Sequence, residues 1–362
     1  MKSVFGEVVS ATVATIAGII LVICGLWGAA SILLPLMLAG TELSTERSNR
    51  GAAFAASNKS ALVLIRVAKD DWQPLLLDLQ TGKQRRLTST GAQLRSPSLS
   101  TDGERLLLVR HPKNNSGSEL LSCDTDRLSC KLLVKKVDTA IHSPIELSNG
   151  RVLYIASPLH TGGDGRKRYS RHDVWLLEPQ SGPRQLTDLQ LYQMSTISVT
   201  RNEIYFSAFG SPPQRPFIPR GDPSAPEASS IFRLPFDPAE GEVTAPTRLL
   251  EPLFVAPGIA RALVASPDGS QMAFLRTTSL GNYRFDLVIA DMRSGKEHTI
   301  TSVGMGYSTP VIVGNDVLAV DIIEGRSVIR MVTGGERDSK IVADIVDKAA
   351  ANAEVVELAI PR

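Results

Sequence analysis

The chain has 362 residues, a formal net charge of +2 and a hydrophobic content of 43%. This length holds one sizeable domain with an appendage. The small net charge and the 5% aromatic content argue against nucleic acid as a partner, because such proteins present a basic face or a row of stacking aromatic side chains.

A long uncharged segment dominates the N-terminal region. Residues 8–39 contain no charged side chain and follow a short N-terminal tail, residues 1–7. About 20 apolar residues cross a bilayer as a helix, whereas the apolar core of a secretory signal peptide usually has about 7–15. We therefore expect one transmembrane helix over 8–39 and a small, polar linker over 40–57. An uncleaved or unusually long signal peptide is the alternative.

Two observations disagree about the side of the membrane that the domain faces. Lys2 precedes the apolar segment and several basic residues, from Arg47 onward, follow it. By the positive-inside rule this count favours a cytoplasmic domain. Cys123 and Cys130, at facing positions of an expected hairpin, instead favour a disulfide in an oxidising compartment, with two free buried thiols as the alternative. We expect a bacterial inner-membrane anchor and a periplasmic domain, and the cytoplasmic orientation stays open.

After the linker, a unit of four short strands recurs about every 40–55 residues, the period of a β-propeller. The outer hairpins are expected at 74–88, 119–134, 173–187, 230–250, 285–300 and 327–342. Inner strands precede them, joined by turns such as Asp102-Gly103 and Asp268-Gly269. The sequence thus predicts an all-β fold over 58–362, a six-bladed β-propeller of four-stranded antiparallel blades preceded by one transmembrane α-helix.

The first blade is expected to lack a good inner strand. A strand over 354–360, donated from the C-terminus, would complete this blade and cover exposed sheet edges. Alternatively, residues 54–57 fill that place and the C-terminal strand packs elsewhere.

Two repeats are nearly regular: SPSLSTDGERLLLVR (residues 96–110) and ALVASPDGSQMAFLR (residues 262–276). Two outer hairpins end in Leu-Thr, as RRLT at 85–88 and RQLT at 184–187. These phrases resemble the repeat of the TolB-type six-bladed propellers, over about residues 57–362. The resemblance implies the fold and a periplasmic protein with cell-envelope partners. The chain departs from that family in having an expected anchor and no room for its N-terminal α/β domain, so the family's partners are not carried over.

The sequence shows no catalytic or metal-binding pattern. It has no Gly-x-Ser-x-Gly elbow, and its five histidines do not occur at metal-ligand spacings. We expect no catalytic residue, no metal and no cofactor, and we expect the histidines on loops or at the surface.

The connections from the second to the third strand of each blade vary in length and emerge on one face, which often marks the binding face of a repeat protein. The connection over 157–173 carries a cationic cluster that suits an acidic partner or lipid headgroups. The connection over 207–230 is rich in proline, and we expect it to reach a neighbour. A solvated loop and a disordered excursion are the respective alternatives. The candidate partner-binding residues on these two connections are Arg166, Lys167, Arg168, Arg171, Arg215, Phe217, Ile218 and Arg220.

These features favour a membrane-anchored propeller that acts as a non-catalytic interaction, accessory or scaffold subunit of a membrane or cell-envelope complex. One alternative is a ligand-binding or sensing propeller that uses its central channel, with Arg95, Ser96, His142 and Ser143 on the inner strands as starting points. A propeller hydrolase or lyase is the third hypothesis, and the sequence offers little for it. Neither the partner nor a small-molecule ligand is indicated.

Overall fold

The structure is a computed structural model, and its described residues lie within one compact unit, Arg50–Arg362. The described ranges are 55–57, 60–68, 71–78, 81, 83–86, 93–100, 103–112, 117–127, 129–161, 167–169, 171–189, 191, 193–209, 229–244, 252–255, 259–277, 285–300, 309–323, 326–333, 339–344 and 354–359. The expected transmembrane helix over 8–39 lies outside them. Within these ranges, no helix of sufficient length and apolar character to cross a bilayer is found.

The described strands form six antiparallel sheets. The first contains β1 (Ala55–Ser57), β2 (Ser60–Ala68), β3 (Asp71–Asp78), β4 (Gln84–Arg86) and β27 (Glu354–Ala359). The second contains β5 (Gln93–Leu99), β6 (Arg105–His111), β7 (Gly117–Asp124) and β8 (Cys130–Val137). The third contains β9 (Thr139–Glu146), β10 (Val152–Thr161), β11 (Lys167–Tyr169), β12 (Asp173–Glu178) and β13 (Gly182–Gln185).

The other three sheets follow the same plan. The fourth contains β14 (Gln193–Val199), β15 (Glu203–Phe209), β16 (Ser229–Asp237), β17 (Glu242–Val243) and β18 (Pro252–Val255). The fifth contains β19 (Ile259–Ala265), β20 (Gln271–Thr277), β21 (Asp286–Asp291) and β22 (Glu297–Ile300). The sixth contains β23 (Val311–Val313), β24 (Asp316–Ile323), β25 (Arg326–Thr333) and β26 (Ser339–Asp344).

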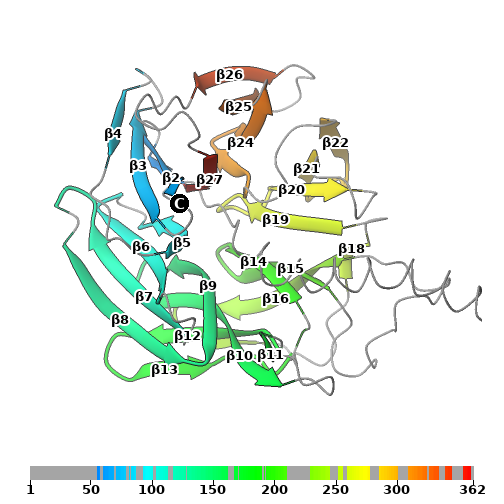
Figure 1. The fold of residues 1–362 in the computed structure, drawn as a ribbon. Helices are drawn as coiled ribbons and strands as arrows, with labels where there is room; N and C mark the ends of the chain where they lie inside the picture. The colour runs from blue at the N-terminus through cyan, green and yellow to red at the C-terminus, as the bar shows by residue number, and fades with distance from the viewer. Residues whose placement is uncertain are drawn as a thin grey trace, which may run out of the picture. The chain divides into compact units, whose positions relative to one another are not determined.

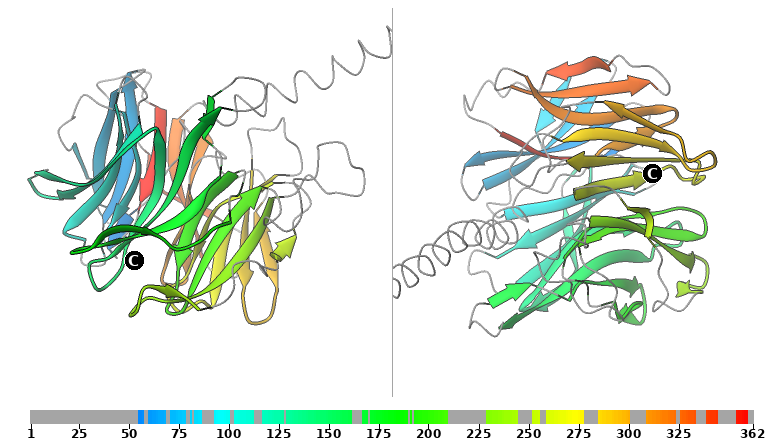
Figure 2. Two further views of the ribbon diagram at one scale, coloured as in Figure 1. Left: turned by 90° about the horizontal axis from the view of Figure 1, so that it is seen from below. Right: turned by 90° about the vertical axis from the view of Figure 1, so that its right-hand side faces the viewer.

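The six sheets are the blades of a propeller. Figure 1 shows them in a ring in chain order, and Figure 2 shows the same blades from the side. Each blade has a hairpin where the sequence predicted an outer one, from β3–β4 in the first blade to β25–β26 in the sixth. The prediction of an all-β, six-bladed propeller is therefore confirmed.

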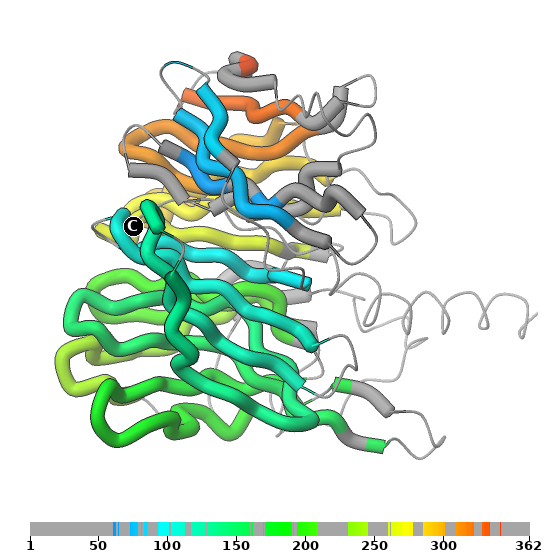
Figure 3. Tube along the Cα trace, turned by 60° about the vertical axis from the view of Figure 1, so that its left-hand side comes forward, coloured from blue at the N-terminus to red at the C-terminus, as the bar shows by residue number. Residues whose placement is uncertain are grey.

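Both ends of the propeller sequence contribute to the first blade. β1 pairs with the beginning of β2, from Ser57↔Ser60 to Ala55↔Leu62. β27 pairs with the following part of β2, from Leu62↔Ala359 to Arg66↔Glu354. The two alternatives for this blade thus occur together, and the last part of the expected linker is a strand. Figure 3 shows the blue strands of the first blade beside the orange strands of the sixth.

The apolar core lies between neighbouring blades. One cluster joins Ile155 and Leu176 of the third blade to Phe206 and Leu234 of the fourth. Equivalent clusters join the second blade to the third, the fourth to the fifth and the fifth to the sixth. Because a middle strand has neighbours on both faces, it is buried on both, as in the run Leu106–Val109 of β6. This explains why these strands read as continuous apolar runs.

A bulge recurs in the first strand of four blades. The ladder register shifts in the second, third, fourth and fifth blades at the same place. At these bulges Ser96, Ser143 and Ala262 adopt positive φ angles of 46°, 51° and 51°. The bulges turn side chains toward the next blade, where Ser143 Oγ accepts a hydrogen bond of 3.0 Å from the N–H of Ile197. The inner strands are thereby connected to one another around the axis.

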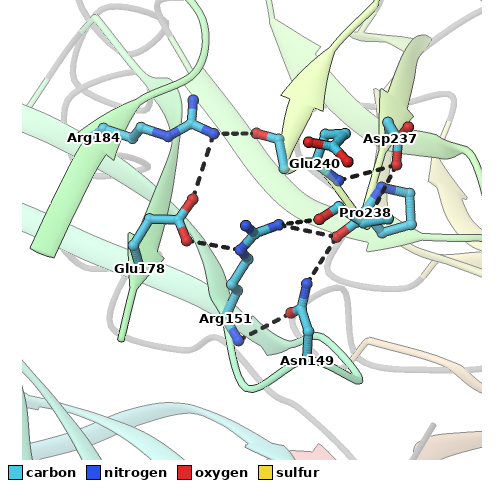
Figure 4. A network of polar contacts seen from close by, with 9 residues as sticks. Asn149, Arg151, Glu178, Arg184, Asp237, Pro238 and Glu240 are labelled. Atoms are coloured by element: carbon cyan, nitrogen blue, oxygen red, sulfur yellow. Dashed lines mark hydrogen bonds and ion pairs between the residues drawn. The ribbon is translucent and has the colours of Figure 1, made fainter. Parts of the chain in front are cut away.

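A polar network joins the turn between β9 and β10 of the third blade to the turn between β16 and β17 of the fourth (Figure 4). The amide of Asn149 and the guanidinium of Arg151 donate hydrogen bonds to the carbonyl of Pro238, at 2.9 and 3.4 Å. Arg151 also donates to the carbonyl of Ala239 at 2.5 Å. These carbonyls belong to the turn between β16 and β17, so the network holds an outer hairpin of one blade against its neighbour.

Candidate functional site

The connection between the second and third strands of the third blade is an extension of that blade. β10 pairs with β9 and β12, and its last three residues pair with β11, from Leu159↔Tyr169 to Thr161↔Lys167. The sequence predicted one loop over 157–173. Instead, both ends of this segment continue as strands, and Lys167 and Arg168 lie on the returning strand β11. We call this face of the propeller, which carries the second-to-third connections, the loop face.

Arg171 follows the extension and marks a sharp turn of the backbone. It is exposed and has a φ of +66°, an angle that is uncommon for a residue with a side chain. Directly after it, His172 exchanges two backbone hydrogen bonds with Leu191, of 2.8 and 3.2 Å. The other candidate partner-binding residues lie outside the described residues: Arg166, Arg215, Phe217, Ile218 and Arg220.

Three histidines gather where the second and third blades meet, close to the loop face. The rings of His142, on β9, and His172, just before β12, have centroids 5.4 Å apart in an edge-on arrangement. His111, at the end of β6, has its Nδ1 atom 3.2 Å from Ser118 Oγ. That hydroxyl also accepts a 3.1 Å hydrogen bond from the N–H of Ile141 in the third blade. These contacts connect the histidine cluster, His111, His142 and His172, across the boundary between two blades.

The expectation that these histidines lie on loops or at the surface is wrong. His111 and His142 are half-buried on strands, and His172 is only 8% exposed. No local spacing reveals the cluster, because its members are distant in sequence and meet only when the strands of the third blade pair and the second blade stacks on the third. The one usable signal was His142 itself, which the sequence already placed on an inner strand beside Ser143.

The environment keeps two of these imidazoles neutral. Burial, together with the nearby charge of Arg95, lowers the pKa of His111 to about 3. Burial, followed by the proximity of His172, lowers the pKa of His142 to about 3. Neutral imidazoles are hydrogen-bond donors and acceptors at ordinary pH. His111 and His142 therefore contribute polar groups without charge to this cluster.

Arg95 supplies a cation to the same region. Its side chain is 8% exposed and donates a 3.1 Å hydrogen bond to Gln93 Oε1. Burial and Asp138 raise the pKa of Tyr169 on β11, while Arg95 opposes this rise. Arg95 thus acts electrostatically on both His111 and Tyr169, which extends the cluster from the inner strand β5 to the extension. Within the described ranges, no group of three or more His, Cys, Asp or Glu side chains is placed to hold a metal ion.

Cys123 and Cys130 form a disulfide in the structure. They are a register pair of β7 and β8, with their Cα atoms 4.0 Å apart. Cys123 is 1% exposed, whereas Cys130 is exposed on the outer strand. The bond closes the outer hairpin of the second blade.

Comparison with known proteins supports the fold. No family model and no curated protein sequence matches the chain. Among solved structures, TolB from Acinetobacter baumannii is similar with a TM-score of 0.60 and 12% identity, over 83% of this chain and 67% of that one. Hydrazine synthase from Kuenenia stuttgartiensis has a TM-score of 0.58 and 12% identity, over 84% and 47%. A puromycin-hydrolyzing peptidase from Mycobacterium tuberculosis has a TM-score of 0.53 and 10% identity, over 83% and 54%.

The fold and these comparisons define the class of protein: a six-bladed β-propeller of the kind found in TolB. The same fold occurs within larger proteins of different activities, of which this chain spans about half. Since a propeller supports unrelated functions, the fold alone does not assign one.

Proposed function

We propose that this chain is a non-catalytic, membrane-anchored propeller that binds another protein of a membrane or cell-envelope complex through its loop face. The observation that carries the proposal is the two-stranded extension of the third blade. Its returning strand β11 contains Lys167 and Arg168, and the exposed Arg171 follows shortly after. Cations on a projecting hairpin are suited to an acidic surface of a partner.

The disulfide between Cys123 and Cys130 supports a periplasmic location for the propeller. Disulfides persist in oxidising compartments and are rare in the cytosol. With the uncharged segment over 8–39 as a single span of the bacterial inner membrane, the propeller would be held on the periplasmic side.

The sequence supports the non-catalytic part of the proposal, because it lacks a nucleophile elbow. The chain matches 54% of the length of the similar peptidase.

Cross-linking in the native membrane tests this function. The membrane is treated with an amine-reactive cross-linker, extracted in mild detergent and analysed by mass spectrometry. We expect cross-links from Lys167 to one membrane or envelope protein. Extraction of the membrane at high pH should leave the chain in the lipid fraction if 8–39 spans the bilayer.

A matched pair of charge reversals makes the test specific. Changing Arg168 and Arg171 to Glu reverses two cations of this connection, leaves the amine of Lys167 in place for the cross-linker and should abolish the cross-linked complex. The control changes Arg127 and Arg201 to Glu, because these are exposed cations in turns on the opposite face. A chain that migrates as a lone monomer, or a complex lost equally in both variants, would refute the proposal.

A second candidate function rests on the histidine cluster and Arg95. A buried guanidinium beside neutral imidazoles can bind a small organic acid by charge and hydrogen bonds. In that case the propeller would be a ligand-binding or sensing module. Histidine ring resonances in NMR spectra would shift on addition of such acids, and His142→Gln would weaken the response.

A further inference from the structure

The outer strand of the second blade, β8, differs from the outer strands of the other blades. It has 8 residues, whereas β4 has 3, β13 has 4, β17 has 2, β22 has 4 and β26 has 6. In the described residues β8 pairs with β7 alone, and it runs along the outer rim of the molecule (Figures 1 and 3). Folded proteins usually keep such edge strands short, because an open edge can pair with another strand.

β8 also exposes apolar side chains. Among the described residues the exposed large hydrophobic side chains are Leu132, Val137 and Ile341, with exposed fractions of 47%, 66% and 49%. Two of these three lie on β8. An apolar side chain on a strand that is already at the rim offers packing area to an added strand.

The backbone of β8 presents hydrogen-bonding groups outward. The Cα atoms of Cys123 and Cys130 are 4.0 Å apart, the spacing of a non-hydrogen-bonded pair. The preceding residue, Ser129, accepts a hydrogen bond from the N–H of Asp124 on β7. Since backbone groups alternate along a strand, those of Leu132, two residues further in the same register, point away from β7. The disulfide holds this edge in register.

The charge of β8 indicates the kind of strand that would pair with it. The strand carries Lys131, Lys135 and Lys136 and no acidic residue. At its end lies a cavity of about 320 Å³ lined by Arg110, Pro112, Ser118, Glu119, Lys135, Lys136 and Val137. The one carboxylate of this lining, Glu119, accepts from Arg110 at 2.7 Å and lies 3.2 Å from Lys135. The lining therefore keeps a positive balance.

We propose that β8 is a docking edge for an extended, acidic segment of a partner protein, which adds to the second blade as a further strand. Main-chain hydrogen bonds to Leu132 would supply affinity. The side chain of Leu132 and the lysines would select alternating apolar and acidic residues. This docking edge lies on the rim and does not depend on the loop-face partner proposed above.

A defined peptide tests the docking edge. The probe is a nine-residue peptide of alternating Glu and Val with a fluorescent label, added to the full chain in mild detergent and followed by fluorescence anisotropy. We expect saturable binding that weakens with salt. Leu132→Pro removes an outward N–H without removing a bond to β7, and should lower the affinity at least tenfold. Lys131→Glu leaves the backbone hydrogen-bonding groups of β8 unchanged and replaces a cation with an anion, so it should lower the affinity for the acidic peptide severalfold. Ile341→Ser, which changes an exposed apolar residue on another outer strand, should have no effect.

Each result decides the proposal. Circular dichroism establishes that the variants are folded, and if Leu132→Pro unfolds, Lys131→Glu still tests the edge. Binding that is unchanged in Lys131→Glu, or equally weakened by Ile341→Ser, would overturn the proposal. The proposal would also be overturned if no binding were seen at about 1 mM peptide, because a Kd above that value is weak even for a transient encounter. Concentration-dependent self-association that Leu132→Pro removes would mean that a second copy of the chain occupies the edge, and the acidic partner would be rejected.

Discussion

Arg151 Nε donates a 2.7 Å hydrogen bond to Glu178 Oε2 within the third blade. This ion pair orients the guanidinium so that its remaining N–H groups meet the carbonyls of Pro238 and Ala239 in the fourth blade. Glu178 is also 3.5 Å from Arg184, which donates to the carbonyl of Gly241. One carboxylate thus positions two arginines that hold the neighbouring blade.

Removing that carboxylate should loosen the boundary between the third and fourth blades. Glu178→Ala leaves Arg151 and Arg184 without their orienting partner, and their side chains are 22% and 42% exposed. We expect a loss of about 1–3 kcal/mol in the free energy of unfolding, the usual range for hydrogen bonds to charged groups. Chemical denaturation monitored by fluorescence measures it.

The control for this prediction is the exposed ion pair between Arg85 and Asp126. Its side chains are 48% and 85% exposed, and its atoms are 3.4 Å apart. Arg85→Ala should therefore change the free energy of unfolding by less than about 1 kcal/mol. Equal effects of Glu178→Ala and Arg85→Ala would contradict a structural role for the network.

Gly241 is needed at the same boundary for a steric reason. Its φ is +73°, and a Cβ atom there would lie 2.7 Å from Leu176 Cδ2. Leu176 is fully buried, so it cannot move aside without disturbing the core. Gly241→Ala should destabilise the propeller by about 1–2 kcal/mol for the left-handed backbone, and by a further ~1–3 kcal/mol for the clash.

Comparison with Gly150→Ala separates the steric cost of Gly241→Ala from its backbone cost. Gly150 has a similar φ of +77°, but nothing lies within 4 Å of the position that a Cβ atom would take there. It should show the backbone cost alone in thermal melts of the two variants. If both substitutions lowered the melting temperature equally, the close contact with Leu176 would have no energetic effect.

Much of the fold could be predicted because the turns are local. Asp102-Gly103 and Asp268-Gly269 lie between apolar strands, and the two glycines do adopt positive φ angles of 75° and 70°. Such positions are signalled by two adjacent residues, so the repeat can be counted from the sequence. The buried middle strands can be predicted in the same way, because each appears in the sequence as an unbroken apolar run.

The candidate site could be predicted only in part. The sequence pointed to His142 on an inner strand, but His172 joins it through the pairing of strands within the third blade, and His111 joins it through the stacking of the second blade on the third. It also predicted a loop where β10 and β11 continue pairing, because the glycines and basic residues of this segment hide the pairing of Leu159 with Tyr169. Contacts between blades involve residues distant in sequence, and no local pattern encodes them.

The neutral histidines make stability depend on pH. The pKa of His111 and that of His142 are lowered from 6.5 to about 3 by burial. Below pH 6.5 the unfolded chain binds protons that the folded chain does not, so stability should fall from pH 6.5 toward pH 3. We expect a loss of about 1 kcal/mol for each histidine between pH 7 and pH 5.5. Urea denaturation at each pH measures this slope.

Substitution assigns the slope to these residues. The slope of unfolding free energy against pH reports the number of protons taken up on unfolding. His111→Asn and His142→Gln should each lower this number by about one, and the double variant should lower it by about two. Their stabilities at pH 8 give the part of each effect that does not titrate. The carboxylates act in a lower window, because hydrogen bonds, first that of Ser266, lower the pKa of Asp268 from 3.8 to about 2. A wild-type slope that survives in the double variant would show that other groups titrate in this range.

Removing the disulfide should destabilise the second blade and with it the edge strand β8. The bond between Cys123 and Cys130 closes a short loop, for which chain entropy gives a contribution of about 2–3 kcal/mol. The double change of Cys123 and Cys130 to Ala should therefore lower the melting temperature, and backbone amides of β8 should exchange faster with deuterium. Cys24→Ala is the control, since it removes the third cysteine and leaves the bond intact.

Alkylation of membranes without reductant tests whether the bond forms in the cell. If Cys123 and Cys130 react there as free thiols, the propeller lies in a reducing compartment and the periplasmic assignment is wrong.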